Sequence, residues 1–457
     1  MRPLLVLVVT LLVSPSTLAA AAPTVPPGEL MRIPELDLEL EVFQMPGAVA
    51  ERLAGLRAGE GQLVTAFPVA PGRRADVRIE PVEIFGPSTR FVVVDHGVER
   101  LLPRPSTRHF AAVSLDREDR LALHLGPDGR LRGTSLTAAG WYELRPADGG
   151  RTVIERLPEL GLRFDCSTPD PVAPLGGPRH AGAPAIGAVP DAANTATYGG
   201  ILAVDTDTEV MDQRFSNSTS EAADWIADMM ALTNVIYEQD LDLHFFLGQV
   251  ILRIGSDPYT LTGSPVTSAQ LSELASHWDA TYDDVERTFA LLLSGKSSND
   301  LSASGRAHSN GASAYCSTSI GYSVNQIFKH PLVPLASSVF IIAHEVGHNL
   351  GSPHTHCYTP AIDHCFSGEG AGCYAGATSC PGGVGNPGTL MSYCHLLDND
   401  VNLIADCGSN LLELHPTVAS TLDGYAATAA GASCLSDPIF WDDLETGDLT
   451  AWSTSVP

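Results

Sequence analysis

The hydrophobic and polar positions follow two different periods, which divide the chain into two regions. In residues 30–165, apolar residues often alternate with polar ones, as in LDLELEVF over residues 36–43. A period of two is typical of strands with one buried face. The stretch RLALHLGPDGRLRG contains Asp128-Gly129, a pair that favours a tight hairpin turn. We therefore predict a β-rich module for this first region.

From about residue 198 onward, helical and strand patterns alternate. Trp225, Met229, Leu232 and Ile236 mark one face of a helix. The remaining pattern predicts a short strand at 201–204, two strands within LHFFLGQVILRI, a helix over 270–293, a strand in SNGASAYC (309–316) and a last helix over 416–430. The second region is therefore expected to be an α/β domain.

One predicted helix carries the candidate chemistry. The run PLASSVFIIAHEVGHNL (334–350) is apolar on most sides and has no internal proline, so we expect a buried helix that ends near Gly351. His344 and His348 are four residues apart, so their imidazoles project from one face, one turn apart. Glu345 lies beside them, within reach of a metal-bound water but poorly placed as a third ligand.

The residues after this helix complete the candidate metal site. Gly351 permits a sharp turn, after which His354 can return as a third nitrogen ligand. Three neutral imidazoles leave a fourth position for water, as in a catalytic zinc site. The alternative is three unrelated histidines, but this spacing arises by chance in only about one sequence of this length in ten thousand. The pattern therefore favours the metal.

These residues resemble a known family. HEVGHNLGSPH (344–354), followed by Met391 in GTLMSYC (388–394), resembles the zinc signature and the methionine turn of the metzincin metalloproteases. Within that superfamily, the segments LAVDTDTEVMDQRF, NVIYEQDLDLHFFLGQVIL and GYSV resemble the reprolysin or adamalysin group, over residues 198–436. Two positions depart from that group: Thr355 stands where an aspartate is usual, and Tyr393 is more like astacins and serralysins.

The resemblance implies a fold and a set of site residues. It implies an α/β (α+β) catalytic domain with a mixed, mostly parallel five-stranded sheet and a long zinc-binding helix, preceded by the β-rich prodomain. It also implies one catalytic Zn²⁺ and an extended substrate paired with an edge formed by SNGASAY. The implied site residues are His344, His348 and His354 as ligands, Glu345 as the base that activates a zinc-bound water, and Gly351 and Met391 in structural roles.

Two nearby residues, Tyr393 and His356, each allow more than one interpretation. The Tyr393 hydroxyl either stabilises the oxyanion, as the resemblance allows, or belongs to a packed aromatic that bonds to backbone. His356 competes with His354 as a ligand, but the signature spacing favours His354. No motif indicates Ca²⁺, although the resemblance is compatible with it.

Composition and charge limit the classes of partner that we expect the protein to bind. The formal net charge of −27 argues against nucleic acid or an anionic membrane surface as partner, because both attract cationic proteins. No apolar run is long enough for stable membrane insertion. We expect protein or peptide substrates, and the sequence leaves the oligomeric state open.

The chain ends and linker composition predict five segments. Residues 1–21 have the one arginine, short apolar run and small residues of a secretory signal. Residues 22–166 form the β-rich prosegment, and 167–197 form a linker dense in proline, glycine and alanine that proteases can cut. The protease domain spans 198–436, and an acidic tail spans 437–457. The destination is expected to be extracellular or periplasmic.

The nine cysteines fit an oxidising destination. Eight lie after residue 300, and the resemblance implies that Cys316 pairs with Cys434 while the other six pair among themselves. Cys166 is alone in the prosegment, and three interpretations stand for it: an inert buried thiol, a bridge to another chain, or a thiolate that binds the zinc in the latent form. We favour the third.

The sequence thus predicts a secreted zinc-dependent endopeptidase that is made as a zymogen. Two other classes remain as alternatives. One is an inactive binding module that kept the zinc fold, against which Glu345 argues because a binder needs no general base. The other is a zinc amidase that acts on a non-protein amide such as cell-wall peptide.

Overall fold

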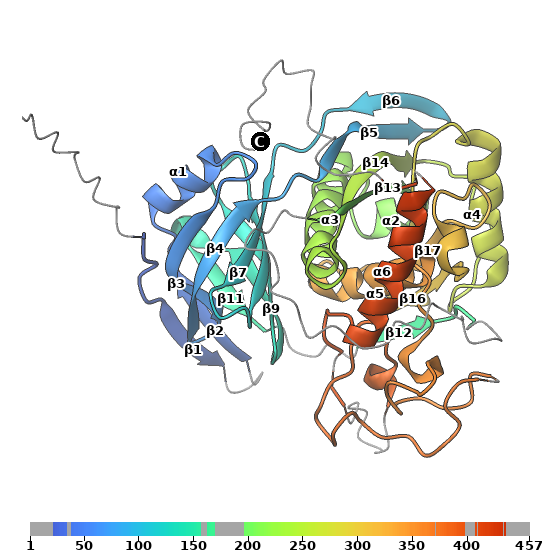
Figure 1. Cartoon of the computed structure of the whole chain (residues 1–457). Helices are drawn as coiled ribbons and strands as arrows, with labels where there is room; N and C mark the ends of the chain where they lie inside the picture. Colours follow the sequence, from blue (N-terminus) through green and yellow to red (C-terminus); the bar gives the residue numbers. More distant parts are fainter. Residues whose placement is uncertain are drawn as a thin grey trace, which may run out of the picture.

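The computed structural model describes residues 22–33, 38–156, 162–169, 196–370, 372–397, 407–408, 410–432 and 434–435. Two lobes lie side by side, an N-terminal β lobe and a C-terminal α/β lobe (Figure 1). The predicted signal sequence, most of the predicted linker and the acidic tail lie outside the described residues.

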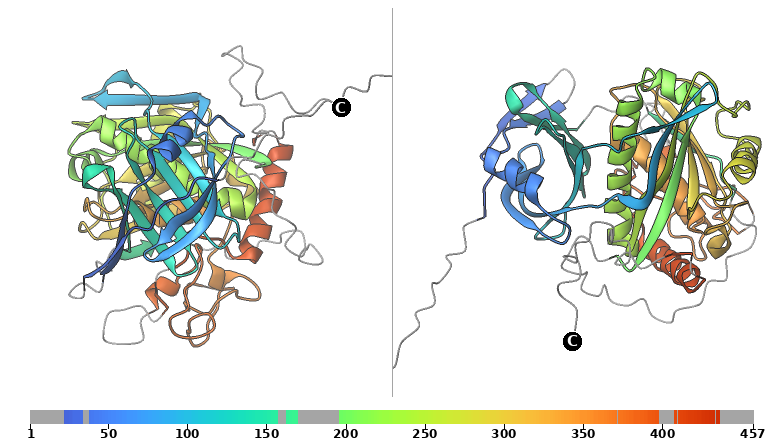
Figure 2. Two further views of the ribbon diagram at one scale, coloured as in Figure 1. Left: turned by 90° about the vertical axis from the view of Figure 1, so that its left-hand side faces the viewer. Right: turned by 90° about the horizontal axis from the view of Figure 1, so that it is seen from above.

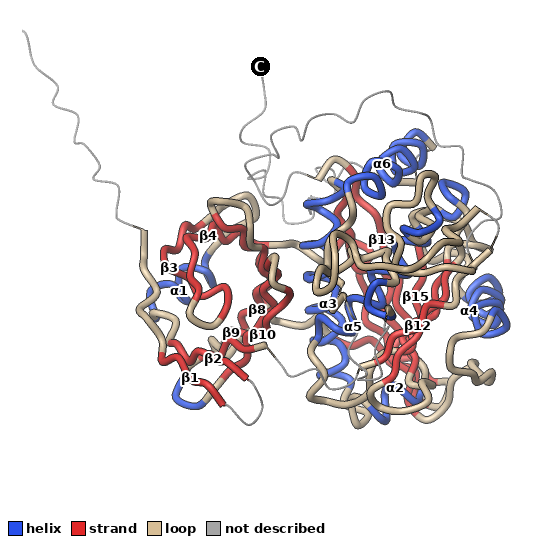
Figure 3. Tube along the Cα trace, turned by 90° about the horizontal axis from the view of Figure 1, so that it is seen from below, coloured by secondary structure: helices blue, strands red, loops and turns tan. Residues whose placement is uncertain are grey.

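The N-terminal lobe is a curled antiparallel sheet. Over the residues described there, its strands in spatial order are β1 (Glu29–Ile33), β2 (Leu38–Phe43), β11 (Thr152–Glu155), β10 (Gly140–Pro146), β9 (Leu131–Thr137), β8 (Arg120–Leu125), β7 (Arg108–Ser114), β4 (Arg73–Pro81) and β3 (Gln62–Ala70). The sheet wraps around a core that also takes up Val49 and Leu53 of helix α1 (Gly47–Gly55) (Figure 3). The alternating pattern predicts this β-rich module correctly, including the hairpin of β8 and β9 around Asp128-Gly129.

The C-terminal lobe is built on a mixed, mostly parallel sheet. Among the described residues its order is β12 (Arg163–Cys166), β16 (Ser302–Ala307), β17 (Tyr322–Gln326), β15 (Phe289–Ser294), β13 (Tyr198–Thr206), β14 (Leu243–Ile254), β5 (Phe85–Asp95) and β6 (Val98–Leu102). Two pairings in this sheet are antiparallel, β16 with β17 and β5 with β6, and the other five are parallel. Five of these strands follow residue 197, whereas β12, β5 and β6 come from the predicted prosegment. The sheet therefore joins two parts of the chain that the sequence assigns to separate segments.

Helices cover both faces of this sheet (Figure 2). Side chains of α2 (Thr208–Gln213), α3 (Thr219–Leu241), α5 (Leu335–Asn349) and α6 (Pro416–Gly431) enter the core on one face, and α4 (Ser268–Thr281) enters the core on the other. Capping fixes two of the helix starts, because Ser218 accepts a hydrogen bond from Glu221 N and Thr267 forms a capping box with Gln270.

Three predicted elements are wrong, and each error has a physical cause. The helix expected over 270–293 ends at Thr281, and FALLLS becomes β15 because a continuous apolar run suits a strand buried on both faces. LHFFLGQVILRI is one strand, β14, with a register shift near Gly248 where the pattern suggests a break. The strand expected at 309–316 is a short 3-10 helix, η3 (Gly311–Ala314), so the sheet edge is β16 instead.

The cysteine pairing agrees with the expectation. Cys316 and Cys434 form a disulfide that ties the end of α6 to the loop before β17. The other six pair among themselves, as Cys357–Cys373, Cys365–Cys394 and Cys380–Cys407. Cys166 is the one free cysteine within the described residues.

A buried polar cluster lies where the two lobes meet. Asp228 on α3 accepts hydrogen bonds from Arg132, with nitrogen–oxygen distances of 2.6 and 3.1 Å, and lies 3.1 Å from His109 Nε2. His124 Nδ1 is 3.5 Å from Asp228 Oδ1. Burial raises the pKa of Asp228, but His124, His109 and Arg132 outweigh it and hold that pKa at about 2. This carboxylate stays ionised at neutral pH.

His124 in this cluster gives the folded protein a specific pH dependence. Burial lowers its pKa from 6.5 to about 3, against the attraction of Asp228 and with help from His109 and Arg132. The unfolded chain binds a proton at this residue below about pH 6.5, whereas the folded chain does not until about pH 3. The free energy of unfolding should therefore fall on acidification by up to about 1.4 kcal/mol per pH unit because of His124.

We predict that His124→Gln removes this dependence. Between about pH 7.5 and pH 5, the loss of unfolding free energy in urea titrations should be about 2 kcal/mol smaller in the variant than in the parent, since the other titrating groups are shared. Equal losses in the two proteins would contradict the assignment.

Candidate metal centre

Helix α5 and the turn after it bring the three predicted histidines together. Every residue of α5 from Ala336 to Asn349 is buried, and His344 and His348 face the same side. Gly351 adopts a φ of 110°, which disfavours other residues, and its N–H donates to His348 O at 2.9 Å. The chain then turns back, so that His354 is also fully buried beside the other two.

One potential ligand atom from each of four residues converges on a single point. These atoms of Cys166, His344, His348 and His354 all lie within 4.8 Å of one another. His348 Nε2 is 3.1 Å from His354 Nε2 and 3.5 Å from Cys166 Sγ. Ligand atoms around a tetrahedral Zn²⁺ are separated by about 3.3 Å, given bonds of about 2.0–2.1 Å. The spacing suits that ion.

Hydrogen bonds at the far side of each ring fix which nitrogen faces this point. His344 Nδ1 lies 2.7 Å from Leu390 O, His348 Nδ1 lies 2.8 Å from Ser352 O, and His354 Nδ1 lies 3.2 Å from Glu369 Oε1. Because carbonyl and carboxylate oxygens accept only, each Nδ1 is the donor and each Nε2 presents a lone pair.

Facing lone pairs repel unless a cation or a proton lies between them. Burial and the neighbouring histidines keep the pKa of His344 well below 6.5, so a proton is disfavoured there. His344 Nε2 is moreover buried without a hydrogen-bond partner among the described residues. The donor set therefore fits a Zn²⁺ ion.

Glu345 lies beside the histidines and is fully buried. Its Oε2 accepts a hydrogen bond from Thr168 Oγ1 at 2.9 Å, and burial raises its pKa to about 7 although that hydrogen bond opposes the shift. A side chain at Gly305 of β16 would place Cβ 2.1 Å from Glu345 Oε1. Glycine at that position thus lets the carboxylate lie against the sheet edge.

Strand β12, which comes from the predicted prosegment, occupies the edge of β16 next to this site. It pairs in parallel with β16 from Arg163↔Ser302 to Cys166↔Gly305, and Ser167 N continues the ladder to Gly305 O at 2.9 Å. Phe164 packs against Phe340, His344 and His395, with ring centroids 5.3–5.4 Å apart. Burial raises the pKa of the Cys166 thiol to about 11.

Tyr393 lies beside the same site and contacts β12. Its hydroxyl donates to Cys166 O at 2.9 Å, and its ring lies 4.2 Å from that of His354. Both interpretations of this tyrosine therefore remain: it bonds to backbone in this form, and it lies beside the candidate ligands.

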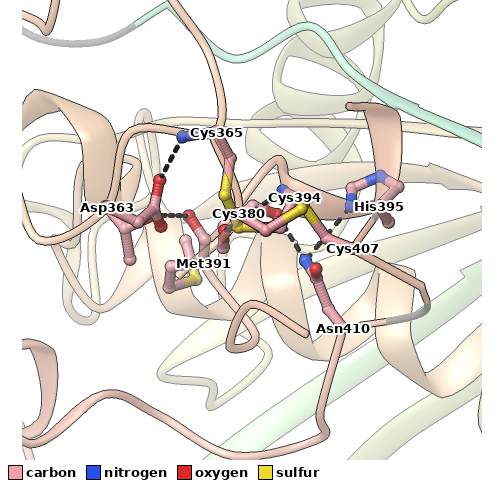
Figure 4. Close-up of a disulfide and its surroundings, with 10 residues drawn as sticks. Asp363, Cys365, Cys380, Met391, Cys394, His395, Cys407 and Asn410 are labelled. Atoms are coloured by element: carbon pink, nitrogen blue, oxygen red, sulfur yellow. Dashed lines mark hydrogen bonds between the residues drawn. A yellow bond between two sulfur atoms is a disulfide. The ribbon is translucent and has the colours of Figure 1, made fainter. Parts of the chain in front are cut away.

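The turn that contains Met391 packs against helix α5 next to the histidines. Met391 is fully buried, and a side chain at Gly347 would place Cβ 2.4 Å from Met391 Sδ. Thr355, which replaces the usual aspartate, donates to Met391 O through its N–H at 3.0 Å and so joins the two turns. The Cys365–Cys394 disulfide and the Asn410–His395 hydrogen bond hold the segment that follows Met391 (Figure 4).

Sequence reasoning missed Glu369. Its two oxygens lie 3.2 Å from His354 Nδ1 and 2.5 Å from His356 Nε2. Hydrogen bonds from both histidines lower its pKa below the usual range, against the effect of burial. His356 is thus fully buried behind His354. Glu369 lies in a glycine-rich loop without periodicity, so no spacing marks it.

One comparison with known proteins agrees with this geometry. Residues 200–400 match the family Reprolysin_5, described as metallo-peptidase family M12. These residues therefore resemble an M12 metallopeptidase domain. The match supports a zinc metalloendopeptidase with peptides or proteins as its substrate class.

The chain is similar to the crystal structure of metalloproteinase-II from Bacteroides fragilis, with 10% identity over 68% of this chain and 86% of that chain and a TM-score of 0.34. No curated protein matches it. Among the described helices, none has both the length and the apolar character required to cross a membrane.

We predict that Glu369→Gln weakens zinc binding about 10–100-fold, because outer carboxylates that orient a ligand histidine contribute that much to affinity. Competition with a chelator measures the zinc dissociation constant without any activity assay. Asp128→Asn, at an exposed hairpin turn, is the matched control and should leave affinity unchanged. Parental affinity in Glu369→Gln would exclude the positioning role.

Proposed function

We propose that the protein is a secreted endopeptidase made as a latent zymogen, with His344, His348 and His354 as its zinc ligands and Cys166 as a fourth ligand in the latent form. The observation that carries the proposal is the convergence of these four residues while β12 covers the adjacent sheet edge. The disulfides within the described residues support an oxidising destination.

The zinc, when bound, supplies a Lewis acid that polarises the scissile carbonyl and lowers the pKa of water. Every other part of the reaction belongs to the chain. Glu345 takes the proton of the attacking water on its carboxylate and gives it to the nitrogen of the leaving amine, so the carboxylate is regenerated in each cycle. The lack of a side chain at Gly305 leaves room for this carboxylate between the histidines and a peptide paired with β16.

The substrate is proposed to bind along β16. The backbone of β12 pairs with this strand in the latent form, which supports an extended peptide as the occupant of the same edge in the active form. Departure of β12 also frees the Tyr393 hydroxyl from Cys166 O. The hydroxyl is then available to donate to the developing oxyanion.

The alternatives are separated by one assay. Casein hydrolysis in a zymogram, abolished by a chelator and restored by zinc, is the expected result for an endopeptidase. A chain that binds zinc and leaves casein intact would refute this function and favour a binding module or an amidase that acts on cell-wall peptide.

We predict that Glu345→Ala keeps its zinc but lowers kcat/KM at least about a hundredfold, because general-base catalysis contributes roughly that factor. Zinc content by metal analysis and hydrolysis of a quenched peptide measure the two quantities on the same sample. Parental kcat/KM in the variant would eliminate Glu345 as the base.

For latency, we predict that Cys166→Ser gives a precursor that hydrolyses peptide sooner than the parent precursor, with no change in the activity of the mature enzyme. The cause is loss of the sulfur that competes for the zinc. Asp165→Asn, on the exposed side of the same strand, should keep parental latency. A latent Cys166→Ser precursor, or a disulfide to Cys166 in peptide mapping, would contradict the switch.

A further inference from the structure

The predicted prosegment contributes a strand to the interior of the protease lobe. β5 pairs in parallel with β14 at Leu247↔Phe85 and then from Gln249↔Arg90 to Ile254↔Asp95. β6 covers the outer edge of β5, so the hairpin completes the sheet on that side (Figure 2). β14 is therefore an inner strand in this structure, and without β5 it would be an edge.

Both faces of β5 are buried in the protease lobe. Phe91 and Val93 belong to the core that contains α3 and α5, and Val92 and Val94 belong to the core that contains α4. Each of these four side chains is at most 7% exposed. A strand that enters two cores is held like a central strand of a parallel sheet, not like a docked surface segment.

Polar contacts fix the same junction. Leu247 N donates to Ile84 O at 2.9 Å, His244 Nε2 lies 2.7 Å from Glu83 O, and the Thr89 hydroxyl donates to Leu247 O. A second set joins the β lobe to α3, through Arg132 with Asp228 and Thr107 with Asp224. Because the Arg132 guanidinium contacts both oxygens of Asp228, this cluster is an ion pair between lobes and is not suited to a metal.

The strand that blocks the active site is held much less firmly. β12 has four residues and pairs only with β16. A cut in the linker over 167–197 severs the covalent connection between the lobes and leaves every β5–β14 contact intact. No disulfide joins the two lobes in the described chain, so anything that keeps them together after a cut is non-covalent.

We propose that the β lobe is a permanent subunit of the active enzyme, retained on the edge of β14 through β5 after the linker is cut. Relief of latency then comes from detachment of β12 alone. If the lobe left instead, the protease domain would expose a long apolar strand edge and the inward face of α3, a combination that promotes aggregation. The inference rests on the proposed function only in treating the linker as the activation site.

The test uses the full chain with a recognition sequence for a site-specific protease placed in the linker between residues 170 and 195. After complete cutting, verified on a denaturing gel, the sample is passed over a size-exclusion column in native buffer. We expect both fragments to elute together at the size of the uncut protein and to separate only in denaturant. Elution of the C-terminal fragment alone as a monodisperse, folded species would overturn the proposal.

A pair of variants assigns the retention to β5. Phe91→Ala, which removes a side chain buried between the lobes, should increase the rate at which the cut fragments separate at least about tenfold. Leu101→Ala, on the exposed face of β6, is the matched control and should separate at the parental rate. Equal rates for both variants would refute β5 as the retaining element, and the co-elution experiment stands even if Phe91→Ala fails to fold.

The readout is mass and not activity, so the result is separable from the proposed function. Fragments that stay together without hydrolysing casein would refute the endopeptidase and support the retained subunit. An active C-terminal fragment free of the β lobe would refute the retained subunit and support the endopeptidase.

Discussion

Three imidazole lone pairs that face one another among fully buried side chains are the constraint on which the rest of this structure depends. At 3.1 Å, the Nε2 atoms of His348 and His354 repel unless a positive charge lies between them. The far sides of the rings are held by Leu390 O, Ser352 O and Glu369, so the rings cannot rotate away from one another. The rings are also restrained indirectly, because the positions of these acceptors are set by Gly347, Met391 and the disulfide-linked loop.

In the proposed mechanism, latency and substrate binding use the same edge of the same sheet. β16 carries Gly305, which admits both the Glu345 carboxylate and the extended backbone of β12. The segment that blocks the site therefore occupies the place proposed for substrate and presents a thiol to the proposed metal. Two kinds of attachment are combined in one prosegment: a short, replaceable strand at β16 and a deeply buried strand at β14. This division separates inhibition from folding.

Local rules explain which parts of the fold and site the sequence predicts. The period of the helix fixes His344 and His348 on one face, and the turn at Gly351 returns His354, so the candidate ligands follow from spacing alone. The Cys316–Cys434 pair follows from resemblance. The sequence does not predict the boundary between α4 and β15, because an apolar run that is buried on both faces has no period to distinguish helix from strand.

Sequence patterns do not predict contacts between distant segments of the chain. The pairing of β5 with β14 joins residues about 160 positions apart, and neither strand's sequence indicates its partner. Glu369 is missed for the same reason, since its role depends on where the Cys357–Cys373 loop folds back over His354. Thr168, which contacts Glu345, lies in a stretch whose composition indicates only a linker.

If Cys166 and the three histidines share one metal ion in the proposed latent form, optical spectroscopy of the precursor with Co²⁺ in place of zinc should detect the sulfur ligand. Thiolate bound to Co²⁺ gives an intense charge-transfer band in the near ultraviolet, which histidine and water ligands do not give. We expect this band in the intact precursor and its absence from a Cys166→Ser precursor loaded with the same ion. Indistinguishable spectra from the two proteins, at equal cobalt content, would rule out Cys166 as a ligand.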